Sequence, residues 1–170
     1  MATPKRGEVY EIEIEEFEIK EHELYGKHAH VVVSINAIPE NTQLATVVPL
    51  TSPINKETGQ RKDTGDYSRF RRKIPEGAKN RFPGTGTPYS GESIALTEQV
   101  RVVSTDRFTR PPFAKLSDAA MASIELGLAY VLGIPPPASR APTPQPPKPS
   151  QPKALDDPLR PAPGKPFDRG

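Results

Sequence analysis

The chain has 170 residues, of which 22 are proline, 12 are glycine and only 34% are hydrophobic, so one uniformly packed globule is excluded. It has no cysteine, which excludes disulfides, thiolate metal sites and a cysteine nucleophile. The formal net charge of +2 neither favours nor excludes a polyanionic partner. The sequence shows no apolar leader and no apolar run long enough to span a membrane, so we expect a cytoplasmic protein without a membrane segment.

The first half of the chain shows the patterns of short β-strands. Residues Val9–Glu15 alternate between apolar and acidic side chains, which is the period of a half-buried strand. Two β-branched runs, His30–Ser34 and Ala45–Leu50, are typical of interior strands of a small antiparallel sheet. Two further short strands are expected at Glu92–Leu96 and Val100–Val103. These runs predict a mainly β fold.

The segment 52–91 lacks sustained periodicity and is rich in Gly, Pro, Lys and Arg, so we expect a long insertion between two strands. Between Arg61 and Arg81 it holds eight basic and three acidic residues, a local excess that could meet a phosphate backbone. Tyr67, Phe70 and Phe82 are interleaved with these arginines. Such a mixture can stack bases while tracking phosphates, and a solvated basic loop is the alternative.

One helix is expected near the end of the folded part. Ser117 can cap its first turn and Gly133 can terminate it. Its apolar stripe comprises Met121, Ile124, Leu128, Val131 and Leu132. Beyond this helix, closely spaced prolines forbid helix and sheet ladders. We therefore predict a folded domain over residues 1–134 and a disordered proline-rich tail over residues 135–170.

Several segments taken together resemble the MazF/PemK/Kid family of toxins from toxin-antitoxin pairs. In chain order they are Lys5-Arg-Gly-Glu-Val-Tyr10, His30-Val-Val-Val-Ser34, Thr46-Val-Val-Pro-Leu-Thr-Ser52, Ile94-Ala-Leu-Thr-Glu-Gln-Val-Arg101 and the helix end Val-Leu-Gly-Ile134. The third segment is the most specific of these. The resemblance covers most of residues 5–134, but neither the insertion 52–91 nor the tail.

The resemblance implies a small SH3-like β-barrel with a C-terminal helix. It implies a homodimer whose groove takes single-stranded RNA, and a cognate antitoxin that blocks this groove. The implied activity is an endoribonuclease without metal or cofactor, in which the ribose 2′-hydroxyl attacks the neighbouring phosphate to leave a cyclic phosphate and a 5′-hydroxyl. The residues themselves also argue against a metal site. His28 and His30 share one side of a strand, but a third ligand with suitable spacing is missing.

This reaction needs a base, an acid and donors for the phosphoryl oxygens. By resemblance Glu98 is the base, with a solvent-exposed turn residue as the alternative. His22 matches a loop histidine that can donate a proton or hold phosphate, with a solvated loop residue as the alternative. Thr51 matches a hydroxyl that orients phosphate. Arg101 either contacts phosphate or pairs with an acid.

Two positions depart from the family pattern. His28 stands where the family has an arginine, and Leu96 replaces an arginine that serves as the acid in some relatives. Catalysis would then depend more on histidine, with His28 holding phosphate when protonated. For His30, in a valine-rich strand, we favour a buried neutral imidazole bonded to the backbone.

A further group of residues is expected to bind RNA. It comprises Ser52, Gln99, Glu23, Arg69, Arg71 and Arg72. For Ser52 the alternative is a turn that precedes Pro53. The insertion that carries the three arginines is also a candidate docking site for the antitoxin.

Two other functions remain open. The missing arginines at positions 28 and 96 favour a catalytically inactive module of this fold that binds RNA or a protein. Inhibition of a topoisomerase is the second, because a toxin of the same fold has that activity. Glu98, His22, Thr51 and Arg101 favour the endoribonuclease.

Overall fold

The computed structural model describes residues 3–15, 23–55, 58–61, 68–83 and 91–135. The chain divides into a unit of residues 1–140 and a second unit of residues 141–170, which lies wholly outside the described residues. The predicted disorder of the tail and the role predicted for His22 therefore concern residues outside the described part. None of the helices in the described ranges has both the length and the apolar character needed to cross a bilayer.

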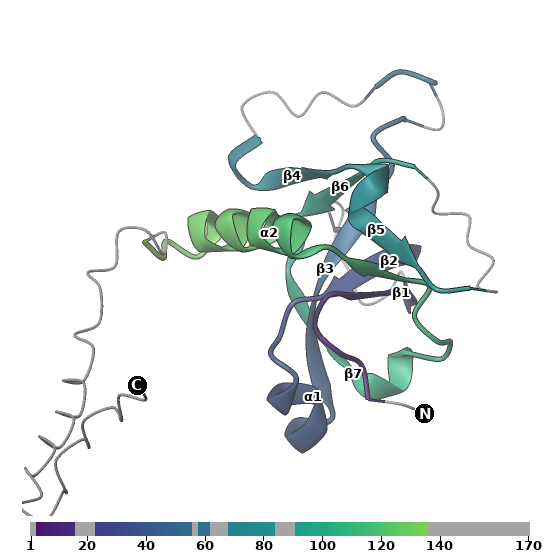
Figure 1. Ribbon diagram of the computed structural model, residues 1–170, viewed down its shortest axis with the longest axis vertical. Helices are drawn as coiled ribbons and strands as arrows, with labels where there is room; N and C mark the ends of the chain where they lie inside the picture. Colours follow the sequence, from purple (N-terminus) through teal and green to yellow (C-terminus); the bar gives the residue numbers. More distant parts are fainter. Residues whose placement is uncertain (1–2, 16–22, 56–57, 62–67, 84–90, 136–170) are drawn as a thin grey trace, which may run out of the picture. The chain divides into compact units, whose positions relative to one another are not determined.

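Short strands make up most of the first unit. The elements are β1 (Glu8–Ile14), β2 (Gly26–Val32), α1 (Ala37–Thr42), β3 (Leu44–Thr51), β4 (Arg71–Ile74), η3 (Glu76–Ala78), β5 (Lys79–Arg81), β6 (Ser93–Leu96), η4 (Thr97–Gln99), β7 (Arg101–Ser104), η5 (Thr105–Arg107), β8 (Ala114–Leu116) and α2 (Asp118–Val131). The five strands predicted from periodicity correspond to β1, β2, β3, β6 and β7. The mainly β fold with a C-terminal helix is confirmed (Figure 1).

The strands β1, β2 and β3 form an antiparallel meander at the centre of the sheet. Tyr10 lies opposite His30, and Val31 lies opposite Val48. Side chains alternate between the two faces of a strand, so Ala29 and Val31 face one side and His30 faces the other. The prediction that the two β-branched runs form interior strands is confirmed by the strand order β4-β6-β3-β2-β1-β8-β5.

The described part of the insertion 52–91 contains regular strands, which the composition does not predict. It contains β4 and β5, which lie at opposite ends of the strand order and yet are joined by the single turn η3. This connection bends the antiparallel sheet into a half-barrel (Figure 1). The expectation of one long connection was wrong because these strands are short and are held by distant partners. β4 pairs with β6, β5 pairs with β8, and Ile74 at the end of β4 is fully buried.

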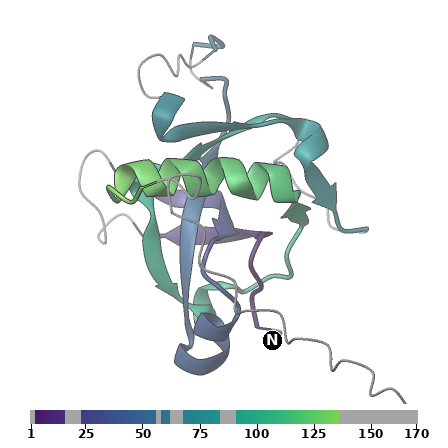
Figure 2. The same cartoon turned by 60° about the vertical axis from the view of Figure 1, so that its left-hand side comes forward.

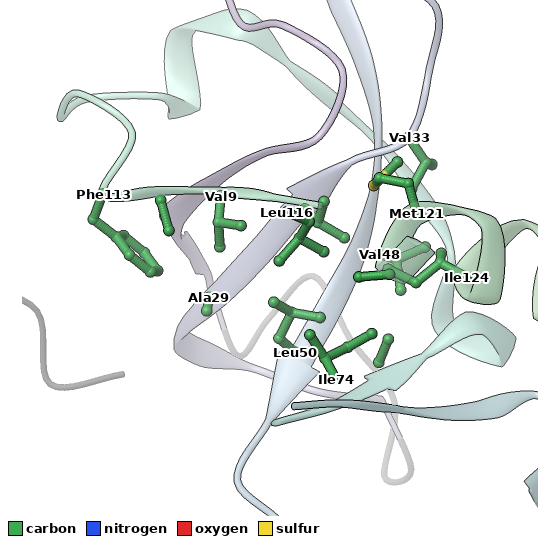
Figure 3. Close-up of a cluster of buried hydrophobic side chains, with 14 residues drawn as sticks. Val9, Ala29, Val33, Val48, Leu50, Ile74, Phe113, Leu116, Met121 and Ile124 are labelled. Atoms are coloured by element: carbon green, nitrogen blue, oxygen red, sulfur yellow. The ribbon is translucent and has the colours of Figure 1, made fainter. Parts of the chain in front are cut away.

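The helix α2 lies across one face of the sheet (Figure 2). Its residues Met121 and Ile124 pack with Val48, Leu50 and other buried side chains of the sheet (Figure 3). The Ser117 Oγ accepts a hydrogen bond from the Ala120 N–H at 3.3 Å, which confirms the predicted N-cap.

The C-terminal end of α2 fits the prediction only in part. Gly133 has φ +65°, a conformation that suits glycine and confirms the predicted terminator. Val131 and Leu132, however, are 37% and 59% exposed. The predicted apolar stripe is therefore wrong in its last turn, because contact with the core ends before it.

Candidate functional site

The face of the sheet opposite α2 carries both a small core and several of the predicted site residues. Tyr10, Ile12, Val47 and Phe108 belong to a buried cluster there, with the Tyr10 and Phe108 rings edge to face at 4.8 Å. Arg101 lies opposite Val47 on the neighbouring strand, so its side chain shares this face.

His28 and Thr51 share that face too. Ala29 lies opposite Leu50, so the next residues along, His28 and Thr51, are neighbours across β2 and β3. Both are half-buried. Ser52, one residue further, is exposed, and its Oγ accepts from the Ile54 N–H at 3.0 Å. That contact is the turn predicted as the alternative for Ser52.

A groove with a volume of about 380 Å³ opens beside this face. It is lined by Ile14, Glu23, Glu98, Gln99, Val100, Arg101, Val102, Val103 and Arg107. These residues come from the end of β1, the segment before β2, and the run from η4 to η5. Both β6 and β7 pair with β3, and the turn η4 interrupts what would otherwise be one strand. This interruption takes Glu98 out of the strand ladder and into the groove.

The Glu98 carboxylate is held on one side and unpaired on the other. Arg71 Nε donates to Glu98 Oε1 at 2.7 Å. Glu98 Oε2 is buried and has no hydrogen-bond partner among the described residues. The side chain is 25% exposed, which does not fit the alternative of a solvent-exposed turn residue. A buried, unsatisfied carboxylate oxygen is costly, so it is typical of a position that a bound group completes.

Contacts between η4, β7 and the segment before β2 fix one wall of the groove. Gln99 Oε1 accepts from the Leu24 N–H at 2.8 Å. Arg101 Nη2 lies 3.8 Å from Glu23 Oε2, with the Arg101 side chain 19% exposed and that of Glu23 49% exposed. A half-exposed pair at this distance is weak. Arg101 is therefore paired with an acid, and this pair is weak enough for a phosphate group to replace Glu23.

His30 is a buried neutral imidazole, as predicted. Its Nδ1 lies 3.0 Å from the His28 carbonyl oxygen, which can only accept, so Nδ1 carries the proton. The pKa of His30 is lowered to about 4, mainly because the ring is buried; the bond to the His28 carbonyl opposes this shift, and the charges of Arg101 and His28 add to it. At neutral pH His30 therefore adds no charge to this face.

The three arginines of the insertion separate into two groups. Arg71 lies opposite Leu96 on β6 and contacts Glu98. Arg72 points to the other face, where its Nε donates to Ser123 Oγ on α2 at 3.0 Å. The Arg69 guanidinium lies 5.7 Å from the centre of the Tyr130 ring, also on α2. The structure thus brings only Arg71 to the site that holds Glu98.

One charged residue of the groove was missed in the sequence. Arg107 lines the groove from η5, and its Nη1 donates to the Glu13 carbonyl oxygen at 3.2 Å. Its only sequence signal is a second arginine shortly after Arg101, which is too common to single out. Within the described ranges, no group of three or more His, Asp or Glu is arranged to hold a metal ion.

The fold is similar to solved MazF structures. MazF from Deinococcus radiodurans superimposes with a TM-score of 0.57 at 19% identity, covering 79% of this chain and 100% of that chain. A MazE-MazF structure from the same organism gives 0.53 at 18% identity, again over 79% and 100%. The Mycobacterium tuberculosis toxin MazF-mt6 gives 0.50 at 6% identity, over 75% and 98%. At these identities the similarity establishes the fold.

Comparison of the sequence with family profiles is more specific. No curated protein sequence matches the chain. The profile of the PemK-like, MazF-like toxins of type II toxin-antitoxin systems matches residues 5–132, which include the whole groove. The chain therefore belongs to the family of PemK-like, MazF-like toxins of type II toxin-antitoxin systems.

Proposed function

We propose that this toxin is an endoribonuclease that cleaves single-stranded RNA without a metal ion, with Glu98 as the general base. The observation that carries this proposal is the Glu98 carboxylate, whose Oε1 is fixed by Arg71 while its buried Oε2 has no partner among the described residues. A carboxylate that lines a groove, is held in one orientation and keeps one oxygen without a protein partner among the described residues is suited to accept the proton of a ribose 2′-hydroxyl.

The remaining steps follow from the groups around Glu98. As the Glu98 carboxylate takes the proton, the 2′-oxygen attacks phosphorus and the bond to the 5′-oxygen breaks, which leaves a cyclic phosphate. The guanidinium groups of Arg101 and Arg107 in the same groove stabilise the charge that develops on the phosphoryl oxygens. His28, on the same face, and His22 are the candidates for the acid that protonates the leaving 5′-oxygen.

The position of Arg71 favours turnover over a binding-only module. The argument for an inactive protein was the absence of arginine at positions 28 and 96, and the position of Arg71 answers it for position 96. Arg71 lies directly opposite Leu96, and it reaches Glu98 from the neighbouring strand. A guanidinium group is thus present beside the base, although it comes from a different strand.

The family also supports two partners for this chain. We expect a cognate antitoxin that occupies the groove, since the similar Deinococcus radiodurans structure is described as MazE-MazF. A homodimer is expected from the family resemblance, with RNA bound in its groove. The remaining predicted RNA-binding residues, Ser52, Arg69 and Arg72, would then contact RNA outside the groove of one protomer. Cleavage of cellular RNA would place the toxin in the cytoplasm.

The test is incubation of the full chain with a defined single-stranded RNA in the presence of EDTA, followed by analysis of the product ends. We expect cleavage with cyclic phosphate and 5′-hydroxyl ends. Glu98→Gln should lower the rate by about 10²–10⁴-fold while RNA binding is retained. Glu92→Gln is a matched control, because Glu92 also pairs with an arginine, Arg61, but does not line the groove.

Two results would contradict the proposal. One is loss of cleavage in EDTA that zinc or magnesium restores. The other is unchanged cleavage by Glu98→Gln. Binding without any cleavage by the parent protein would support the inactive RNA-binding module, and inhibition of a topoisomerase without RNA cleavage would support the remaining alternative.

A further inference from the structure

The C-terminal half of α2 carries apolar side chains that the core does not cover. Leu126 and Tyr130 are 46% and 51% exposed. The helix lies beside β4 (Figure 1, Figure 2), and there the structure has a second groove of about 290 Å³. This α2 groove is lined by Arg69, Arg72, Leu126, Ala129, Tyr130 and Ile134. An exposed apolar surface that also carries two cations is a candidate binding surface.

Flat side chains are layered along this groove. The Phe70 and Tyr130 rings are nearly parallel, with 13° between their planes and 6.2 Å between their centres. Parallel rings at this distance are offset, so neither covers the other. The Arg69 guanidinium carbon lies 5.7 Å from the centre of the Tyr130 ring. Because half of the Tyr130 side chain is exposed, aromatic surface remains open to a further flat group.

The two arginines of the α2 groove keep their charge uncompensated. Arg72 donates to Ser123 Oγ and to the Ser68 carbonyl, both at 3.0 Å, and both acceptors are neutral. Arg69 contacts the Tyr130 ring. In the part of the chain that the structure describes, neither guanidinium pairs with a carboxylate. The groove therefore attracts an anion, and guanidinium groups are suited to phosphate.

The α2 groove lies close to the groove that holds Glu98. Both of its arginines lie within two residues of Arg71, which donates to Glu98 at 2.7 Å. The Phe70 carbonyl accepts from the Thr97 N–H at 3.3 Å, so this segment packs against the residue before Glu98. Among the described strands β4 pairs with β6 alone and ends the strand order. A single RNA strand at Glu98 can thus pass over the edge of β4 and reach the α2 groove.

The chemistry of the α2 groove favours a nucleotide over a peptide. An acidic polypeptide would also be attracted by two arginines and by apolar side chains. Layered aromatic and guanidinium groups, however, are typical of surfaces that bind single-stranded nucleic acid, because every base has an aromatic face and every nucleotide a phosphate. The short path to Glu98 favours the same ligand.

We propose that the α2 groove binds a nucleotide of the RNA outside the cleavage site, with its base stacked on Tyr130 and its phosphate paired with Arg69. This contact strengthens the binding of longer RNA and needs no particular base, because stacking tolerates any sequence. The inference rests on the proposed function for RNA as the ligand, and it does not require cleavage.

The test measures binding of the full chain to fluorescent single-stranded RNAs of about 6 and about 12 nucleotides. All their 2′-hydroxyls are methylated, so the proposed attack cannot occur. Tyr130→Leu keeps an apolar side chain but removes the aromatic face. We expect this variant to bind the longer RNA about tenfold more weakly than the parent does, and the shorter RNA equally well. Tyr130→Phe should bind both RNAs like the parent.

Two further variants test the assignment. Tyr25→Leu is the matched control, because Tyr25 is 52% exposed and lines neither groove, and it should keep the affinity of the parent for the longer RNA. Arg69→Ala should lower the slope of log affinity against log salt concentration by about 0.7, as expected for one lost phosphate contact. Arg69→Ala decides the question even if Tyr130→Leu fails to fold, which its melting temperature will show.

Several outcomes overturn the inference. Equal affinity of Tyr130→Leu and the parent for the longer RNA excludes the stacked base, and an unchanged salt slope in Arg69→Ala excludes the phosphate contact. An equal loss with the shorter RNA would mean that Tyr130 does not act on a separate nucleotide. If Tyr130→Leu leaves RNA binding unchanged but weakens binding of an acidic Glu/Leu peptide, the surface belongs to a polypeptide. If it converts a dimer to a monomer in sedimentation, a second copy covers the surface.

The inference and the proposed function can fail separately. A protein that shows the expected pattern of RNA binding but never cleaves unmodified RNA contradicts only the proposed function. Cleavage of unmodified RNA, together with no effect of Tyr130→Leu and Arg69→Ala on binding, contradicts only the inference.

Discussion

The two faces of the curved sheet use the same strands for different purposes. On the face covered by α2, buried aliphatic side chains surround Ile124, and nearly all of the contact is apolar. On the opposite face, the cluster around Tyr10 and Phe108 gives way to the groove that holds Glu98, Arg101 and Arg107. The difference shows that stability and chemistry are divided between alternate residues of single strands.

The strand β4 shows this division between neighbouring residues of one type. Arg71 contacts the candidate base, whereas the next residue, Arg72, bonds to Ser123 and to the Ser68 carbonyl beside the helix. Variants on the side of α2 should therefore change mainly stability, and variants beside the groove should change mainly activity.

Ile124→Ala should destabilise the protein most. Ile124 is fully buried between α2 and the sheet, so its truncation removes apolar contacts and leaves a cavity. We expect a loss of about 2–5 kcal/mol in the free energy of unfolding, measured by urea titration. Leu126→Ala on the same helix, at a side chain that is 46% exposed, is the control and should change little. Similar losses in both would mean that the helix does not bury the assigned face.

His30 should make stability depend on pH. The imidazole takes up a proton below about 6.5 when unfolded but only below about 4 when folded, so stability falls as the pH is lowered through this window. The total contribution is about 3 kcal/mol. His30→Asn keeps a donor for the His28 carbonyl and cannot titrate. Between pH 7 and pH 4, the free energy of unfolding of this variant should therefore fall by about 3 kcal/mol less than that of the parent. An unchanged pH dependence would show that the imidazole is not buried neutral.

Arg71→Ala and Arg72→Ala should separate activity from stability. Without Arg71 the base loses its orientation, so we expect kcat to fall by about 100-fold with unchanged RNA affinity, and Arg71→Lys to recover part of the loss. Arg72→Ala should leave kcat within a few-fold but lower the melting temperature, because its stem and two hydrogen bonds contact the helix side. Equal effects of the two variants on kcat and on the melting temperature would show that Arg71 and Arg72 do not have separate roles.

Gly127→Ala should have the smallest effect, and it tests the contact between α2 and η4. A Cβ at this position would lie 2.9 Å from Thr97 Oγ1, and Thr97 is fully buried. We expect a loss of about 1–2 kcal/mol, less than for a cavity because alanine favours helix. Glu98 follows Thr97, so kcat should fall as well. Gly77→Ala, which meets nothing within 4 Å, is the control; matching results would exclude the close contact.

Much of the fold could be predicted from local patterns. The alternation in β1, the β-branched runs of β2 and β3, and the caps at Ser117 and Gly133 are short-range signals that the structure confirms. The strands β4, β5 and β8 and the helix α1 were missed, because each is short and carries no clear apolar periodicity of its own. Such short elements are held by partners far away in the sequence, which periodicity does not detect.

The candidate site could likewise be predicted only in part. The resemblance identified Glu98, Gln99, Arg101 and Glu23, which the structure brings to one groove, while their roles stay predictions. It identified Arg71 only as one of several RNA-binding arginines, although this residue contacts Glu98. Arg107 carried no specific signal, because a groove exists only once η4, β7 and η5 are folded together.

From the sequence alone came the positions of β1, β2, β3, β6 and β7, the start and end of the last helix, and the family to which the chain belongs, because these depend on neighbouring residues and on short motifs. Folding in three dimensions decided which arginine meets Glu98 and how the strands of the basic insertion bend the sheet into a half-barrel. These features depend on strand pairing between residues far apart in the chain, such as Arg71 with Leu96 and Asn80 with Lys115. Pairing of that kind is fixed by the packing of the whole sheet and not by any local pattern.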